Sequence, residues 1–202
     1  MKALLIIDMQ NDFLPGGSLE VPEGDVVIPV INKIQDQFEL VIATQDWHPE
    51  GHGSFASRHQ GKEPMDKTEL NGLEQILWPD HCVQGSEGAE FTKELDMKRV
   101  EAIFRKGMDP GIDSYSGFYD NGHKKSTGLA DYLRGRNVTE LSVTGLAGDV
   151  CVNFTIMDAL KEGFNTTLII DGTRPVDKDA FEEAVENMKK NGVKILQSGD
   201  LL

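Results

Sequence analysis

The sequence predicts an α/β protein: a single three-layer domain in which a mostly parallel sheet carries helices on both faces. Short apolar runs alternate along the chain with segments whose apolar residues recur at helical spacing, a pattern typical of βαβ units. A length of 202 residues suits one domain with a full-sized core. Because no repeat, low-complexity segment or linker divides the chain, we expect residues 1–202 to form one domain.

Six short apolar runs are predicted to be the strands of this sheet. The first, residues 3–7, is apolar throughout, as expected of a strand that is buried on both faces. The others are residues 40–44, residues 100–104, a run that begins at residue 141, residues 166–170 and residues 193–196. Since the carboxyl ends of parallel strands share one edge of a sheet, polar residues that follow these runs are candidates for a common site.

Four segments between the strands are predicted to be helices. The first is capped by Asp25 and carries apolar residues at helical spacing as far as Phe38, with Pro29 near its first turn. The others are residues 127–133, a segment from about residue 150 to Gly163, and a helix that is capped by Asp177 and closed by Gly192. Residues 48–88 show little periodicity and are expected to form a long irregular segment that is either functional or disordered.

Composition and charge narrow the range of partners. A net charge of −14 argues against nucleic acid and anionic membranes as partners, and it leaves a homo-oligomer open. Cys82 and Cys151 are too few for a disulfide framework, although one bridge between them stays open. The apolar run at residues 3–7 is too short for a signal peptide, and no other run is long enough to span a bilayer. We therefore expect a cytoplasmic protein.

Reactive side chains fall at the ends of four predicted strands. Asp8 ends the first strand and Asp46 the second, while Lys106 follows the third and Cys151 the fourth. Because these strand ends meet at one edge, the four residues are expected to converge on one crevice. Each also has an ordinary structural interpretation: a turn residue for either aspartate, a solvated lysine, and a small buried hydrophobe for the cysteine.

Cys151, Asp8 and Lys106 form a chemically consistent set. Cys151 is expected in the first turn of a helix, where the dipole can lower the pKa of a thiol below its free value of about 8.5. Asp8 could take the thiol proton and later donate it to a leaving group, if its pKa lies near neutrality. The Lys106 ammonium would stabilise the thiolate beside this carboxylate. The sequence therefore predicts a cysteine nucleophile that is served by an Asp–Lys pair.

A metal site is predicted beside this set. Asp46 and His48 lie two residues apart just beyond a strand, so their side chains point the same way in extended backbone, and His81 could supply a third ligand. Two imidazoles and one carboxylate with open positions suit a divalent Zn, Fe or Mn ion at a working site. Solvated loop histidines are the ordinary alternative. Further ligands could come from His52, from His59, or from Ser54 with a water.

Two aromatic residues lie in the loops that follow Asp8 and Asp46. These are Phe13 and Trp78. Packing that holds a long loop against the core is the ordinary interpretation of either ring. Because both loops start from the same predicted edge, the two rings could instead hold a flat substrate ring between them.

Five segments of the chain resemble one known family. IIDMQNDFLPGGSL, ATQDWHPEGHGSFA, WPDHCVQGSEGAEF, FRKGMDPGIDSYSGFYDN and TGLAGDVCV are similar to sequences of bacterial nicotinamidases, also called pyrazinamidases, among the isochorismatase-like cysteine hydrolases. The resemblance runs from the first strand to the helix after Asp177. It implies a six-stranded parallel sheet between helices, a triad at Asp8, Lys106 and Cys151, metal ligands at Asp46, His48 and His81, and ring-stacking residues at Phe13 and Trp78.

The resemblance also implies a feature of the backbone before the nucleophile. A cis peptide is expected at Leu146–Ala147, and the N–H groups of Ala147 and Cys151 would then form an oxyanion hole. Gly148 departs from the family pattern, in which threonine is common at this position. The departure removes a hydroxyl group close to the predicted nucleophile.

The resemblance implies hydrolysis of nicotinamide, and of pyrazinamide, to the acid and ammonia through a cysteine thioester, as a step of NAD salvage. A related hydrolase acting on isochorismate or an N-carbamoyl compound is the alternative, although it has no use for both a metal and a ring sandwich. A non-catalytic metal or nucleotide binder is a third possibility. It lacks support because no glycine-rich phosphate loop follows the first strand.

Overall fold

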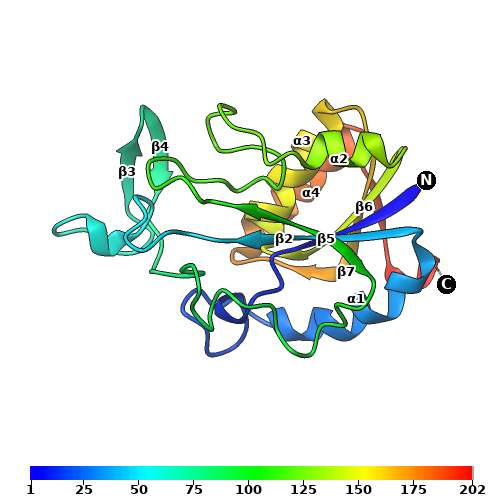
Figure 1. Ribbon diagram of the computed structural model, residues 1–202, viewed down its shortest axis with the longest axis horizontal. Coiled ribbons are helices and arrows are strands. Elements are labelled where there is room, and N and C mark those ends of the chain that lie inside the picture. The colour runs from blue at the N-terminus through cyan, green and yellow to red at the C-terminus, as the bar shows by residue number, and fades with distance from the viewer. Residues whose placement is uncertain (202) are drawn as a thin grey trace.

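A six-stranded sheet forms the middle layer of the computed structural model, which describes residues 1–201. Its strand order is β5-β2-β1-β6-β7-β8, and every neighbouring pair is parallel, so the predicted α/β architecture is confirmed (Figure 1). The strands are β1 (Lys2–Ile7), β2 (Leu40–Asp46), β5 (Val100–Lys106), β6 (Glu140–Leu146), β7 (Asn165–Arg174) and β8 (Lys194–Leu196). All six overlap the apolar runs from which strands were predicted.

Helices cover both faces of the sheet. α1 (Ile28–Ile34) lies on one face, and α2 (Leu129–Gly135), α3 (Asn153–Lys161) and α4 (Lys178–Lys190) lie on the other (Figure 1). β1 is buried from Ala3 to Ile7 and divides its side chains between two cores: Leu4 and Ile6 pack on the α1 side, whereas Leu5 and Ile7 pack on the side of α2 to α4. This two-sided burial explains why the run is apolar without alternation. No helix within residues 1–201 is long and apolar enough to cross a membrane.

The first predicted helix is shorter than expected. Only Ile28–Ile34 is α-helical, and 3₁₀ turns flank it at Gly24–Val27 and Gln35–Gln37. The predicted cap at Asp25 is wrong, because its side chain makes no capping hydrogen bond. Pro29, near the start of the α-helix, lacks an N–H group, which limits regular helix on its N-terminal side. By contrast, Asp177 caps α4 as predicted, accepting from Ala180 N at 3.0 Å.

Residues 48–88 are more regular than the sequence analysis predicted. They contain an antiparallel hairpin of β3 (Lys67–Leu70) and β4 (Leu73–Ile76), which projects from one end of the sheet (Figure 1). Asn71 and Gly72 form its turn with φ of 52° and 81°. An Asn-Gly pair with both residues in the left-handed region is the preferred two-residue connection of a hairpin.

The sheet has a point at which its connections reverse direction. The chain moves outward from β1 through β2 to β5, and then returns to the opposite side of β1 to form β6. In doubly wound sheets, ligands bind at the carboxyl ends of the strands beside such a point. A π-helical segment, Gly148–Val152, follows β6 here and leads into α3. The crevice at this edge therefore receives residues from β1, β2, β5 and the β6–α3 junction.

The close packing of β6 on β1 at this edge depends on Gly145. Its φ is 109°, and a Cβ atom there would lie 2.2 Å from the carbonyl oxygen of Ile7. We expect Gly145→Ala to lower the free energy of unfolding by about 3 kcal/mol in urea denaturation, because both the backbone angle and the space oppose a side chain. Gly135→Ala is the control, since nothing lies within 4 Å and the residue is helical. Equal midpoints for the two variants would contradict this packing.

Candidate active site

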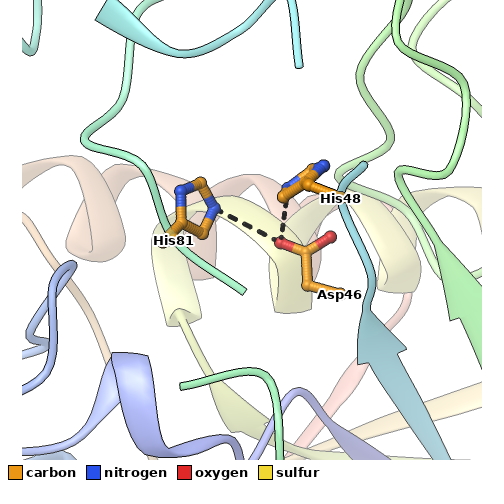
Figure 2. A group of neighbouring side chains, drawn as sticks. All are labelled: Asp46, His48 and His81. Atoms are coloured by element: carbon orange, nitrogen blue, oxygen red, sulfur yellow. Dashed lines mark ion pairs between the residues drawn. The ribbon is translucent and has the colours of Figure 1, made fainter. Parts of the chain in front are cut away.

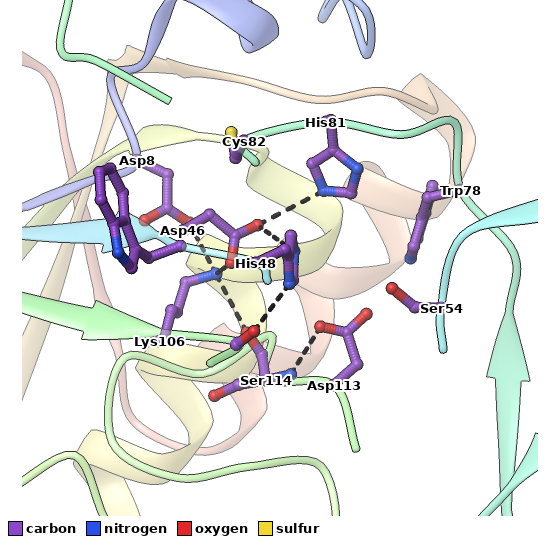
Figure 3. A network of polar contacts seen from close by, with 12 residues as sticks. Asp8, Asp46, His48, Ser54, Trp78, His81, Cys82, Lys106, Asp113 and Ser114 are labelled. Carbon is purple, nitrogen blue, oxygen red and sulfur yellow. Dashed lines mark hydrogen bonds and ion pairs between the residues drawn. The ribbon is translucent and has the colours of Figure 1, made fainter. Parts of the chain in front are cut away.

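The four strand-end residues predicted to converge do lie together. Asp8 follows β1, and Asp46 and Lys106 are the last residues of β2 and β5 (Figure 3). Cys151 lies in the π-helical segment after β6. All four are buried, with Cys151 the most exposed at 8%. Asp8 adopts a left-handed φ of 47°, which turns the chain away from β1 immediately after the strand. The predicted crevice therefore exists, and its reactive groups are largely shielded from water.

The Lys106 ammonium lies between two carboxylates at the centre of this group (Figure 3). Its Nζ is 2.9 Å from Asp8 Oδ2 and 3.1 Å from Asp46 Oδ1, and it also donates to Ser114 O at 3.0 Å and Cys151 Sγ at 3.5 Å. Burial disfavours the charged lysine, but Asp46 and Asp8 outweigh burial and raise the pKa of Lys106 well above its usual value. Lys106 therefore remains a cation beside the thiol.

Asp8 is held at one oxygen and open at the other. Thr44 donates its hydroxyl hydrogen to Asp8 Oδ1 at 2.7 Å. Asp8 Oδ2 makes the ion pair with Lys106 but no hydrogen bond. Burial raises the pKa of Asp8 above its usual value, although Lys106 opposes this shift. A carboxylate with a free lone pair and a raised pKa is suited to accept and return a proton.

The predicted low pKa of the Cys151 thiol is wrong. Burial raises the pKa of Cys151 well above its usual value, and the nearby Lys106 ammonium compensates only in part. The dipole of the local backbone would lower the pKa of this thiol, but desolvation by the surrounding core has the larger effect and raises it. The thiol therefore needs a base to become a nucleophile, and of the two carboxylates paired with its neighbour Lys106, Asp8 is the one whose pKa is raised. Cys82 is also buried, and the two cysteines form no disulfide.

The three predicted metal ligands also meet. Asp46 Oδ2 lies 3.2 Å from His48 Nε2 and 3.5 Å from His81 Nε2, and Figure 2 shows both imidazoles directed at this carboxylate. His48 Nδ1 contacts the carbonyl oxygen of Gly107 at 2.9 Å, and His81 Nδ1 contacts that of Pro79 at 2.8 Å. Donation from each Nδ1 leaves each Nε2 with a free lone pair, as in metal-binding histidines.

The donor set fits a divalent cation. His48 Nε2 is buried and has no hydrogen-bond partner. Burial disfavours a charge on His48, but Asp46 outweighs burial and raises the pKa of His48 to about 9, so this carboxylate attracts positive charge onto the imidazole. A metal ion would supply the same charge and bind the free nitrogen. Gly107 permits the close packing, because a Cβ atom there would lie 2.4 Å from His48 Cε1.

The structure separates the candidates for further ligands. His52 contacts Ser54 Oγ through Nδ1 and the carbonyl oxygen of Asp109 through Nε2, so neither ring nitrogen is free. His59 Nε2 contacts the carbonyl oxygen of Gly53. The buried Ser54 hydroxyl retains lone pairs after donating to His52, and it lies on the same side of the site as His48 (Figure 3). These contacts occupy both ring nitrogens of His52 but leave Nδ1 of His59 free, so Ser54 and His59 both keep a lone pair, and Ser54 is the buried one of the two.

A cavity opens onto both groups of residues. Cys151 and Ala147 line it on one side, and Asp46 and His81 on another. The walls include the aromatic residues Phe13, Trp78 and Tyr115 and the aliphatic residues Leu19, Val21, Val150 and Val176. The cavity therefore combines a thiol, a candidate metal site and apolar walls, which suits a small, flat and largely apolar ligand.

Comparisons with known proteins agree with this arrangement. Residues 2–200 match the isochorismatase domain. This chain belongs to the isochorismatase family. It is 52% identical over 180 residues to the nicotinamidase of Escherichia coli (strain K12), a match that covers 87% of this chain and 84% of that protein.

Two solved structures extend the comparison to three dimensions. A nicotinamidase/pyrazinamidase of Acinetobacter baumannii superposes with a TM-score of 0.97 at 44% identity, covering 100% of this chain and 98% of that one. A pyrazinamidase of Pyrococcus horikoshii in complex with zinc superposes with a TM-score of 0.80 at 40% identity, covering 97% and 98% of the chains. Both likenesses extend over nearly the whole fold.

The isochorismatase-family backbone is present before Cys151. The Leu146–Ala147 peptide is cis, as the resemblance implied. At Gly148, a Cβ atom would lie 2.7 Å from Cε2 of Phe181, a residue of α4. The ring of Phe181 therefore occupies the space beside this position. This contact accounts for a glycine where a larger residue is common in the family.

Some residues of the site were missed by the sequence analysis. Thr44 orients Asp8, and it lies two residues before Asp46 on the same face of β2, so the strand periodicity could have indicated it. Gln10 binds both backbone groups of Asp46, accepting from N and donating to O at 2.7 Å each. No local pattern marks Gln10 or Tyr115, because their partners are distant in sequence.

We expect Cys151 to react with iodoacetamide much faster than Cys82. Both thiols are buried, but Cys151 lines the cavity and lies beside an ammonium group, whereas Cys82 is 0% exposed within the core on the α1 side. Peptide mass spectrometry over a time course would measure both rates in one sample. Equal labelling of the two cysteines in the folded protein would contradict the accessibility assigned to Cys151.

We expect His48→Ala and His81→Ala each to reduce the metal that the purified protein retains by at least about tenfold, because either change leaves an incomplete set of ligands. Metal content per chain would be measured by elemental analysis. His59→Ala is the matched control, since His59 belongs to neither group of side chains that lie close enough to share a metal ion, and it should retain metal at the wild-type level. Full metal content in both ligand variants would exclude this site.

Proposed function

We propose that this protein is a nicotinamidase, a hydrolase that converts nicotinamide and water to nicotinate and ammonia. One observation carries the proposal: a single cavity joins the Cys151 thiol to the metal-binding group of Asp46, His48 and His81 between aromatic walls. The relatives of E. coli and A. baumannii bear the same name. A pyridine carboxamide uses both parts of such a cavity, since its amide can meet the thiol while its ring nitrogen faces the metal.

The first half of the proposed reaction forms a thioester. Asp8 Oδ2, which has no hydrogen bond, accepts the proton of Cys151, and the thiolate attacks the carboxamide carbon. Lys106 stays within reach of both groups, so it remains beside the negative charge as that charge moves from oxygen to sulfur. The N–H groups of Ala147 and Cys151 stabilise the oxyanion. When the C–N bond breaks, Asp8 donates its proton to the departing ammonia.

The second half removes the acyl group. Water attacks the thioester carbon while Asp8 again accepts a proton. When the C–S bond breaks, nicotinic acid is released and Asp8 returns its proton to the sulfur, which restores both the thiol and the carboxylate. Asp46, His48 and His81, with Ser54 as a further candidate, would hold one divalent ion, either Zn, Fe or Mn. When bound, this ion would supply a Lewis acid that anchors the ring nitrogen. Phe13 and Trp78 would contact the faces of the ring.

We expect the metal-loaded protein to release ammonia from nicotinamide and from pyrazinamide, and much less from benzamide, which has the same shape without a ring nitrogen. A direct ammonia assay on purified protein would measure all three. No release from nicotinamide would contradict the proposed function. Equal turnover of benzamide would contradict only the anchoring role of the metal.

The cytoplasmic location of the protein and its assembly into a homo-oligomer stay predictions.

Removal of the nucleophile provides a second test. Cys151→Ala should fold normally and lose at least about 10³-fold in kcat, because the thioester can no longer form. Cys82→Ala is the matched control, since its thiol lies outside the cavity, and it should retain most of the activity. Circular dichroism would establish that both variants are folded. An active Cys151→Ala variant would remove this residue from the mechanism.

A further inference from the structure

The β3–β4 hairpin supplies one buried polar side chain to the wall of the cavity. Gln75 is the one residue of its two strands that is fully buried, at 3% exposure. Its Nε2 atom lies 2.7 Å from Ile76 O, 2.9 Å from Tyr115 Oη and 3.2 Å from Asp113 Oδ2. Tyr115 and Asp113 both line the cavity, whereas Gln75 itself lies behind them. The hairpin is thereby linked to the loop that carries these two residues.

The chemistry of these neighbours fixes the orientation of the Gln75 amide. A backbone carbonyl oxygen and a carboxylate oxygen can only accept hydrogen bonds. If the amide were flipped, its own oxygen would face Ile76 O and Asp113 Oδ2 without a hydrogen atom between them. Gln75 therefore donates from Nε2, whose two hydrogens are shared among three acceptors, and the Tyr115 hydroxyl oxygen at 2.9 Å is one of them.

Tyr115 receives a second donor from the aromatic wall. Trp78 Nε1, which can only donate, lies 3.3 Å from Tyr115 Oη, and the two rings meet edge to face at 6.2 Å. With both donors on its oxygen, Tyr115 must direct its own hydroxyl hydrogen elsewhere, and no acceptor within residues 1–201 receives it. Burial raises the pKa of Tyr115 well above its usual value, with a contribution from Asp113, so this hydrogen is retained.

We propose that Gln75 is a positioning residue, whose amide holds the Tyr115 hydroxyl and, through it, the Trp78 indole in the orientation that binds a planar carboxamide ring. This inference rests on the proposed function, because it assigns these rings to the substrate of the same site. The Tyr115 hydroxyl hydrogen is the group that the arrangement leaves free to meet the bound substrate. Gln75 makes no hydrogen bond to Asp8, Lys106 or Cys151, so it serves binding and leaves the chemical step alone.

The test replaces Gln75 with methionine, which has a similar length and no donor. In a metal-loaded Cys151→Ala background, where substrate binds without turnover, calorimetric titration with nicotinamide should show a Kd about tenfold higher for Gln75→Met. With Cys151 present, the same change should leave kcat within about twofold. Gln35→Met is the matched control: Gln35 is 2% exposed and donates to the carbonyl oxygen of Asp96 beside the end of α1. It should not change the Kd.

A second variant and a second measurement test the same role even if Gln75→Met lowers the stability of the fold. Tyr115→Phe, which removes the accepting oxygen, should raise the Kd to a similar extent, and the double variant should be no worse than the weaker-binding single variant. Trp47→Phe removes the other of the two tryptophans, so that the remaining fluorescence comes from Trp78. In this background, acrylamide quenching of Trp78 should increase with Gln75→Met, because the indole is held less firmly, and should stay unchanged with Gln35→Met.

The outcomes separate the two proposals. The positioning role would be overturned if Gln75→Met and Tyr115→Phe both kept the wild-type Kd for nicotinamide. It would also be overturned if Gln35→Met raised this Kd as much as Gln75→Met does. If the wild-type protein neither binds nor hydrolyses nicotinamide, the proposed function fails. The fluorescence measurement still decides the role of Gln75 in that case, because it needs no substrate: unchanged quenching of Trp78 would overturn the inference.

Discussion

The site depends on the burial of one ammonium group between two carboxylates. Lys106 is 2% exposed, and the side chains of Asp8 and Asp46 that face it are equally shielded from water. An isolated charge in such surroundings would be neutralised or would destabilise the fold. The Lys106 ammonium and the two carboxylates therefore each need an opposite charge beside them to remain ionised. Asp46 uses its second oxygen for the two histidines, while Asp8 uses its second oxygen for Thr44. One cation therefore couples Asp8, the proposed base, to the candidate metal-binding group.

The order of the strands explains how these charges meet. β5, β2, β1 and β6 are consecutive in the sheet, so their carboxyl ends present Lys106, Asp46, Asp8 and the junction to Cys151 in that order. Asp46 and Lys106 are direct partners in the parallel ladder between β2 and β5. Residues that lie far apart in the sequence thus become neighbours through strand pairing alone. The loops then need only to supply His81, the aromatic walls and the cover of the cavity.

This division explains what the sequence could and could not predict. The strands and the residues at their ends were predictable, because continuous apolar runs and βαβ alternation are local signals with one topological consequence. The hairpin was missed although Asn71–Gly72 indicated it, since its strands are short and largely exposed. The pKa of Cys151 and the contacts of Gln75 were beyond the sequence analysis, because both are set by what the folded chain packs around the side chain.

Burial raises the pKa of both Cys151 and Asp8, and this shared shift has a consequence for the chemistry. Proton transfer between them moves one negative charge from a carboxylate to a thiolate without creating another. Lys106 lies 2.9 Å from the first and 3.5 Å from the second, so the ion pair changes its partner and persists. The cost of the anion is thereby similar before and after transfer, even where water is excluded. Burying a lysine costs desolvation free energy and contributes little to the stability of a fold. Lys106 is instead well placed to stabilise a negative charge that moves between Asp8 and Cys151.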